Sequence, residues 1–73
     1  MKYERWIYRD KADGSLLIAQ TEDWLRAESS HGLEFIKHIS GLDEEELVKL
    51  YILSVRYKGN DPRFFMELDN LIK

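Results

Sequence analysis

The most apolar helical pattern in the chain runs from Asp43 to Lys58. Plotted at about 100° per residue, its apolar side chains cover almost the whole cylinder, whereas a surface helix usually shows a stripe only a little wider than about 100°. The clear polar stripe consists of Glu45, Lys49 and Arg56. The pattern therefore predicts a helix that is either wrapped by the rest of the chain or keeps one face for a partner.

Capping signals mark both ends of this helix. Asp43 and Glu46 have the spacing of a capping box, in which each side chain accepts a hydrogen bond from the backbone N–H of the other residue. The acidic side chains of the first turn also suit the positive end of the helix dipole. Gly59 is placed to end the helix.

A second amphipathic helix is predicted over residues 62–73. Pro62 suits the first helical position because its missing N–H costs nothing there, and Asn60 or Asp61 is placed as the cap. The apolar side chains form one stripe and Met66 lies opposite, so we expect Met66 to be exposed. The connection is short, which predicts that the two helices are antiparallel neighbours.

The start of the chain predicts a β-hairpin. Residues 3–9 are rich in aromatic and β-branched side chains, and residues 16–20 form an apolar return strand. Asp13-Gly14 between them is a strong turn signal, because glycine takes a positive φ without a Cβ clash. Alternation along the first strand gives both faces of the hairpin apolar surface. The two faces carry Tyr3 with Ile7 and Trp6 with Tyr8.

The middle of the chain predicts further helices. Thr21 is placed to cap a short helix over residues 22–28, a segment that also fits a third short strand or a loop. Apolar side chains then recur at helical spacing, which predicts a helix over residues 30–40. Gly41 is placed to end that helix in the left-handed conformation.

Together these elements predict an α+β fold in one small domain over residues 1–73. An N-terminal β-hairpin (residues 1–20) packs on a bundle of about three helices (residues 21–73), and the last two helices form an antiparallel hairpin. A chain of 73 residues without cysteine has a small core and no disulfide to support it. The residues expected in the core are Ile18, Leu25, Phe35, Ile36, Ile39, Leu47, Leu50, Val55, Phe64, Leu68 and Ile72.

Charge and composition narrow the classes of function. The net charge is -3 and both signs are mixed along the chain, whereas a protein that binds a phosphate backbone needs a positive face. Charged residues follow Met1 at once, and no apolar run approaches the length of a membrane span. We therefore expect a cytoplasmic protein without a secretory signal or a membrane association.

A basic and aromatic set keeps nucleic-acid binding open as an alternative. Aromatic rings can stack on bases while cations neutralise phosphates. The set consists of Arg5, Arg9, Lys11, Arg56, Trp6, Tyr8 and Trp24. The acidic balance of the chain weighs against this alternative, so nucleic acid is not the expected partner.

Catalytic and metal-binding patterns are weak. His31 and His38 are seven positions apart with Glu34 between them, which on a helix gives roughly one face, but the sequence places no third strong ligand there. The helix dipole alone explains the glutamates at residues 44–46. The serines and glycines lack the spacing of a nucleophile elbow or a phosphate cradle. We expect a non-enzymatic protein with no metal and no cofactor.

The aromatic content of the last two helices is the main indication of function. Aromatic residues and methionine are enriched at protein–protein interfaces. Basic residues at the rim of such a contact give orientation and a faster association. The expected interaction residues are the anchors Tyr51, Phe65 and Met66 with the rim residues Lys49, Arg56 and Arg63. The expected partner is another protein or a second copy of the chain in a homodimer.

Residues 42–73 also carry a recognisable family pattern: a leucine with acidic residues, an apolar pair before a tyrosine, and an asparagine at the turn before a second helix with phenylalanine. The matching residues, with one residue inserted at the turn, are Leu42, Leu47, Val48, Tyr51, Asn60, Phe64, Phe65 and Ile72. In this pattern the segment resembles the Sda family, small helical-hairpin inhibitors of sporulation histidine kinases. The resemblance implies a helical surface that docks on the helical bundle of a signalling kinase.

A second resemblance lies in the last helix. Glu67-Leu68-Asp69 is similar to the end of the Ser-Gln-Glu-Leu-Asp signature of small helical-hairpin phosphatases that act on the response regulator of the sporulation phosphorelay. Phe65-Met66 stands in place of the Ser-Gln pair. This resemblance implies, as an alternative, a regulator that removes phosphate from an aspartyl-phosphate partner.

Overall fold

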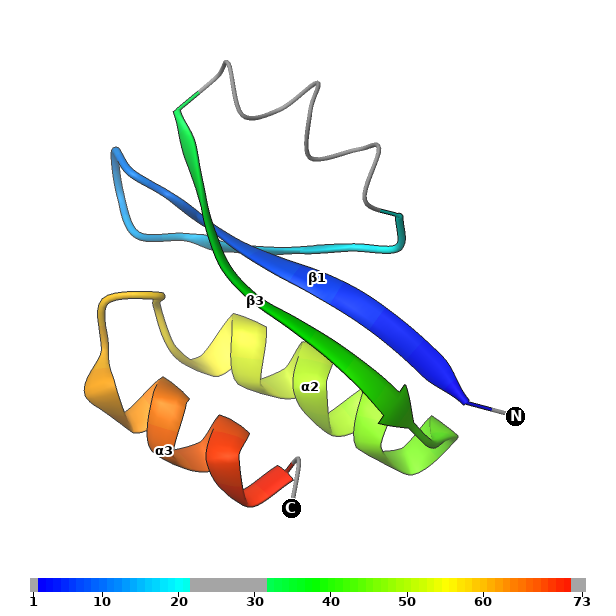
Figure 1. Cartoon of the computed structure of the whole chain (residues 1–73). Coiled ribbons are helices and arrows are strands. Elements are labelled where there is room, and N and C mark those ends of the chain that lie inside the picture. Colours follow the sequence, from blue (N-terminus) through cyan, green and yellow to red (C-terminus); the bar gives the residue numbers. More distant parts are fainter. Residues whose placement is uncertain (1, 22–31, 72–73) are drawn as a thin grey trace.

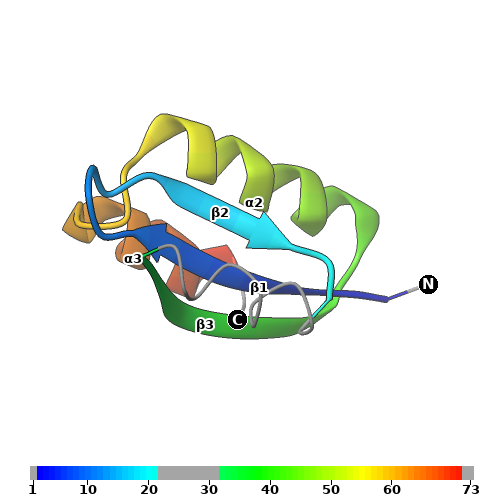
Figure 2. The same ribbon diagram turned by 90° about the horizontal axis from the view of Figure 1, so that it is seen from above.

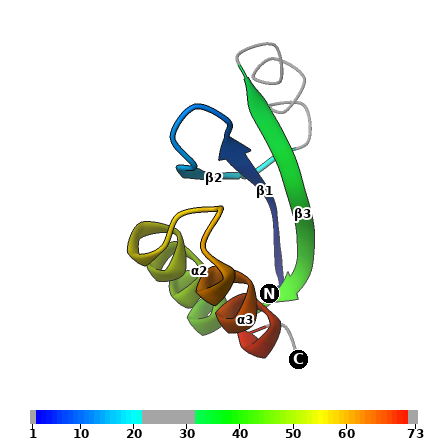
Figure 3. The ribbon, with the colours of Figure 1, turned by 90° about the vertical axis from the view of Figure 1, so that its left-hand side faces the viewer.

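The hairpin predicted at the start of the chain forms part of a three-stranded antiparallel sheet in the computed structural model (Figure 1). The structure describes residues 2–21 and 32–71, and within them the sheet has the order β2-β1-β3. Two helices lie side by side on one face of the sheet, which gives a small α+β fold of two layers (Figure 3). The elements are β1 (Tyr3–Asp10), β2 (Leu16–Ala19), β3 (Leu33–Leu42), α2 (Glu44–Arg56) and α3 (Pro62–Leu71).

The expected bundle of about three helices differs from this arrangement, because the described residues contain the two helices α2 and α3 and a third strand. The helix predicted over residues 30–40 is wrong, since residues 33–42 form β3 and pair antiparallel with β1. The short helix predicted over residues 22–28 lies outside the described residues, as do the expected core residues Leu25 and Ile72.

Two bulges in β3 explain the helical spacing that misled the prediction. The register between β1 and β3 shifts at two places, each time with one extra residue in β3. As a result Ile36, Ile39 and Leu42, which recur at every third position, all contribute to the core beneath the helices. Regular alternation would have placed Ile39 on the opposite face from the other two. A strand with two bulges thus imitates the spacing of a helix.

Gly41 lies at the second of these register shifts and has a φ of 73°. Its predicted left-handed conformation is confirmed, but the glycine sits inside a strand and does not end a helix. Space is open around the position where a Cβ would lie. The backbone conformation is therefore what opposes a larger residue at this position.

The caps of the two helices follow the local sequence signals. The Asp43 side chain accepts from the backbone N–H of Glu46 at 2.8 Å, and the Glu46 side chain accepts from the backbone N–H of Asp43 at 2.9 Å. The predicted capping box is thus confirmed. Pro62 is the first residue of α3, and the Asp61 side chain accepts from the backbone N–H of Arg63 at 2.9 Å. Of the two candidate caps, Asp61 is the one that acts.

The connection between α2 and α3 is fastened to the turn of the hairpin. The backbone N–H of Gly59 donates to the carbonyl of Gly14 at 2.7 Å, and Arg9 Nη1 donates to the carbonyl of Gly59 at 2.9 Å. Arg9 also pairs with Glu34 of β3 at 2.6 Å. A Cβ on Gly59 would lie 2.8 Å from Arg9 Cδ, and α2 already ends at Arg56. Gly59 is therefore needed for this close approach and does not itself end the helix.

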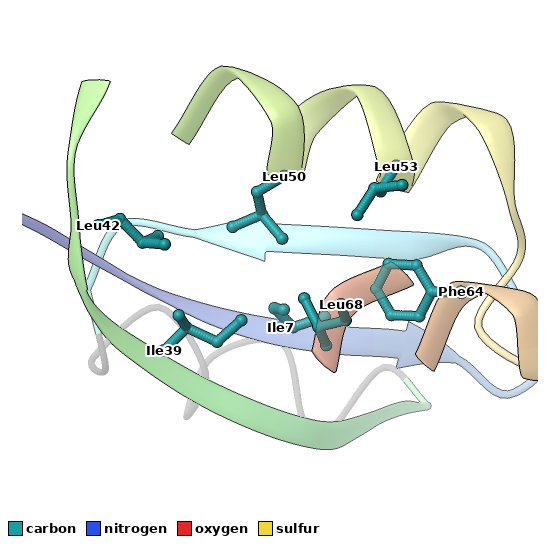
Figure 4. Packing of buried hydrophobic residues seen from close by; sticks show 7 residues of the cluster. All are labelled: Ile7, Ile39, Leu42, Leu50, Leu53, Phe64 and Leu68. Carbon is teal, nitrogen blue, oxygen red and sulfur yellow. The ribbon is translucent and has the colours of Figure 1, made fainter. Parts of the chain in front are cut away.

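The core forms where the sheet meets the inner sides of α2 and α3 (Figure 4). Its buried members are Ile7, Ile39, Leu42, Leu50, Leu53, Phe64 and Leu68. Four expected core residues are confirmed among them, namely Ile39, Leu50, Phe64 and Leu68. Three others, Ile18, Ile36 and Leu47, are partly buried against this core. The sequence did not predict that Ile7, Leu42 and Leu53 would be buried.

Two residues were wrongly expected in the core. Phe35 is exposed on the other face of the sheet, where its ring lies 5.5 Å from the ring of Tyr8. Val55 is exposed because it points away from the sheet on the outer side of α2, which runs alongside β2 (Figure 2). The face of the sheet away from α2 and α3 is also apolar, since Tyr8, Ala19 and Leu33 are buried there with Trp6 packed against them. Neither described helix is long and apolar enough to cross a membrane.

The orientation of α2 predicts opposite effects at two of its apolar positions. Leu50→Ala is expected to lower the free energy of unfolding by about 2–5 kcal/mol because the side chain is fully buried. Val55→Ala is the matched control and is expected to change it by less than about 0.5 kcal/mol. Chemical denaturation followed by circular dichroism measures both values, and equal losses would contradict this orientation.

The bulge at Gly41 generates a second prediction. Gly41→Ala is expected to lower the free energy of unfolding by about 1–2 kcal/mol. The left-handed backbone conformation is unfavourable for alanine even though there is room for its Cβ. Ser40→Ala, one residue earlier and also exposed, is the control and should lie within about 0.5 kcal/mol of the wild type. A neutral Gly41→Ala in denaturant titrations would show that the bulge does not require glycine.

Candidate protein-binding face

The outer side of α2 carries an apolar stripe that the fold leaves open. Its members recur at the spacing i, i+3, i+4 and i+7 and span about 100° of the helix. They are Val48, Tyr51, Ile52 and Val55, and we call them the α2 stripe. All four are exposed, up to 87% for Val55. On the opposite side of the same helix Leu50 and Leu53 enter the core. The helix therefore has two apolar faces, and one of them is open to solvent.

Polar groups surround the α2 stripe. Arg56 lines its edge, and Lys49 forms a loose ion pair with Glu45 at 3.8 Å. The Tyr51 hydroxyl accepts from Arg5 Nε of β1 at 3.3 Å, which holds this ring toward the sheet. Tyrosine and arginine combine apolar surface with hydrogen-bonding groups, and both are common at the centres of protein interfaces.

A second, more polar groove lies between α2 and α3 and adjoins the α2 stripe. Ile52 and Arg56 belong to both, so the two surfaces are continuous. The other residues that line the groove are Glu46, Lys49, Leu53, Glu67, Asn70 and Leu71. An apolar centre beside a charged groove has the composition of a protein-binding surface with a polar rim.

The structure distributes the expected interaction residues over several places. Tyr51 belongs to the α2 stripe, Arg56 lines it, and Lys49 lines the adjoining groove. Phe65 is partly buried against the core, with its ring edge-on to Phe64 at 5.3 Å. Met66 is exposed on α3, as predicted, but it does not line the α2 stripe.

Arg63, the last of these residues, has partners of its own. Its guanidinium binds the Asp61 carboxylate at 2.8 Å and lies 5.2 Å from the centre of the Tyr57 ring. Both contacts sit at the start of α3. Arg63 thus supports the helix cap in addition to presenting a positive charge.

Three members of the α2 stripe were missing from the expected site. Val48 and Ile52 were left unassigned, and Val55 was expected in the core. The available signal was the apolar excess of this helix together with its spacing, since two stripes on opposite sides can be traced in the sequence. The sequence pattern alone does not show which of them faces the sheet.

The sheet separates the basic and aromatic residues of the alternative nucleic-acid patch. Arg5 and Arg9 lie on the side of the helices, where they contact Tyr51 and Gly59. Trp6 and Tyr8 lie on the other side, in the second cluster of apolar residues. Trp24 is outside the described residues. Arg5 and Arg9 therefore do not share one surface with Trp6 and Tyr8.

The histidine and glutamate considered as metal ligands are also separated. The ring of His38 stacks on Trp6 at 4.5 Å, and its Nε2 lies 3.2 Å from the carboxylate of Glu4. Glu34 pairs with Arg9 on the face toward the helices. His31 lies outside the described residues, and the part of the chain that is described holds no group of three potential ligands. The extra residue of β3 between Phe35 and Lys37 places His38 and Glu34 on opposite faces of the sheet, so they do not converge.

Comparisons of the chain with protein families, with curated proteins and with solved structures found no match.

The cap of α3 predicts a pH dependence of stability. The guanidinium and the backbone N–H of Arg63 lower the pKa of Asp61 below its ordinary value of 3.8. A lowered pKa in the folded state gives stability that is present above pH 3.8 and is lost as the pH falls through the folded value. Asp61→Asn keeps a capping oxygen without a charge, so it should show a weaker loss of stability than the wild type on acidification.

Denaturant titrations of the two proteins between roughly pH 6 and pH 2 measure this difference. Part of the loss should persist in Asp61→Asn, because Arg9 lowers the pKa of Glu34 in the same direction. Parallel curves for wild type and variant would show that the Asp61 carboxylate does not contribute to the pH dependence.

Proposed function

We propose that the chain is a small non-enzymatic regulatory protein that binds a partner protein through the α2 stripe. The observation that supports this proposal is the exposure of four large apolar side chains on one helix face. Isolated apolar side chains are normal on a protein surface, whereas a contiguous group rimmed by polar residues is typical of a binding site. The rim here is supplied by Arg56, Lys49 and the hydroxyl of Tyr51.

The shape of the surface favours a helical or grooved partner. An amphipathic helix that presents residues at i, i+3, i+4 and i+7 can lie in an apolar groove, or against the helices of a bundle. The resemblance of residues 42–73 to the Sda family points to the helical bundle of a signalling histidine kinase as such a partner. The α2 stripe would supply the apolar anchors, and Arg56 and Lys49 would orient the complex.

The surface also favours a protein over a nucleic acid. Trp6 and Tyr8, the described aromatic residues of the predicted nucleic-acid patch, lie on the other face of the sheet from Arg5 and Arg9. The α2 stripe itself is apolar, and the acidic first turn of α2 stands at one end of it. Such a surface suits the burial of apolar side chains better than contact with phosphates.

A charge inside the α2 stripe tests this proposal. Val55→Lys should leave folding intact, since Val55 is the most exposed residue of the stripe and a lysine suits the last turn of a helix. Wild type, Val55→Lys and Met66→Lys are immobilised and used to capture proteins from the cells that produce the chain. We expect a partner that wild type and Met66→Lys retain and that Val55→Lys binds at least about tenfold more weakly.

The captured protein is then purified and titrated with the three proteins, and a captured histidine kinase is assayed for autophosphorylation. Inhibition by wild type but not by Val55→Lys would support the kinase as the target. A partner retained equally by Val55→Lys would refute binding through the α2 stripe. Loss of binding in Met66→Lys alone would move the contact to α3.

A further inference from the structure

We propose that two copies of the chain pair through the α2 stripe with their α2 helices antiparallel. This inference rests on the proposed function, because it takes the same face to be a binding surface and names a second copy as one occupant. Two copies of the stripe are complementary in shape and in charge, and they are so only when the two α2 helices run antiparallel.

The shape argument comes from the symmetry of the stripe. Val48 and Val55 lie equally far from the midpoint of the stripe, which falls between Tyr51 and Ile52. A twofold axis at this midpoint sets Val48 of one copy against Val55 of the second copy, a contact that occurs twice. Tyr51 and Ile52 lie on opposite flanks of the stripe, so each of them meets its own counterpart in the second copy. Apolar side chains therefore meet apolar side chains along the whole stripe, with no charge buried between them.

The charge argument comes from the two ends of α2. The first turn carries the acidic residues Glu44, Glu45 and Glu46, and the last turn carries Arg56. Antiparallel pairing brings each acidic end beside the basic end of the second copy and also opposes the two helix dipoles. A parallel pair would bring like charges together at both ends.

One contact across the pair can be named. Glu45 and Arg56 are eleven positions apart, or about three helical turns, so they lie on the same flank of the stripe. The twofold axis maps that flank onto itself, which places Glu45 of one copy near Arg56 of the second copy. Among the described residues Arg56 takes part in no ion pair, and Glu45 has only the loose contact with Lys49.

The pair would be weak, because one helix face per copy is smaller than the ~800 Å² per partner of a standard interface. A dimer of this kind hides the stripe from other proteins. A rise in the concentration of the chain would thus lower the fraction of copies that are free to bind a different partner. The dimer would act as a reserve that competes with the regulatory complex.

Sedimentation of the full chain over a series from about 1 µM to about 1 mM tests whether the pair forms. We expect a reversible monomer–dimer equilibrium that Val55→Lys weakens at least about tenfold and that Met66→Lys leaves unchanged. Circular dichroism and thermal melting verify that each variant is folded. A wild type that stays monomeric throughout, or a dimer insensitive to Val55→Lys, overturns the inference.

Charge exchange tests the antiparallel orientation separately. In Glu45→Arg the named contact joins two cations, and in Arg56→Glu it joins two carboxylates, so each variant alone should dimerise more weakly than wild type. An equimolar mixture of the two restores both opposite-charge contacts in the heterodimer. We expect each variant alone to associate more weakly than wild type and the mixture to regain association. A variant that dimerises alone as well as wild type overturns the antiparallel pair, because a parallel pair already joins like charges in the wild type.

The outcomes also separate this inference from the proposed function. If the wild type is monomeric but binds a partner that Val55→Lys does not bind, the dimer is refuted and the proposed function stands. If Val55→Lys weakens the dimer but does not weaken binding of the partner, the dimer is supported and the proposed regulatory use of the stripe is refuted.

Discussion

The pairing of β3 with β1 is the interaction on which the rest of the structure depends. Through its two bulges, β3 turns Ile36, Ile39 and Leu42 toward the same side as Ile7. These side chains form the apolar surface of the sheet on which α2 and α3 pack (Figure 4). A regular strand of this sequence would split the three residues between the two faces and leave the helices less surface to cover.

This apolar surface of the sheet determines which face of α2 remains exposed. A chain of 73 residues has one small core, and a helix with apolar side chains on opposite sides cannot bury both of them in it. Leu50 and Leu53 are buried because they contact the apolar surface of the sheet and the inner side of α3. The α2 stripe then points outward. The exposed apolar surface is thus a consequence of how the core is filled, and it costs the folded state little, since those side chains are exposed in the unfolded chain as well.

The sequence predicted the features that depend on near neighbours. The Asp13-Gly14 turn, the capping box of Asp43 and Glu46 and the start of α3 at Pro62 each involve residues a few positions apart, and all are present. β3 was mistaken for a helix because its spacing of three arises from bulges, which exist only against β1. Val55 was placed in the core for a related reason: periodicity shows that α2 has two apolar sides, but only the position of the sheet shows which one is covered.

Both ends of α2 are held, and this is what keeps its two faces distinct. The capping box fixes the start of the helix directly after β3, and the bonds of Gly59 to Gly14 and Arg9 fix the chain just beyond its end. A rotation of α2 by one residue, about 100°, would carry Leu50 out of the core and bring a member of the α2 stripe toward the sheet. Since both attachments oppose such a rotation, the residues that stabilise the fold and those that remain exposed are kept apart on one short helix. Substitutions on the outer face can therefore change the surface that we propose for binding while the core stays intact.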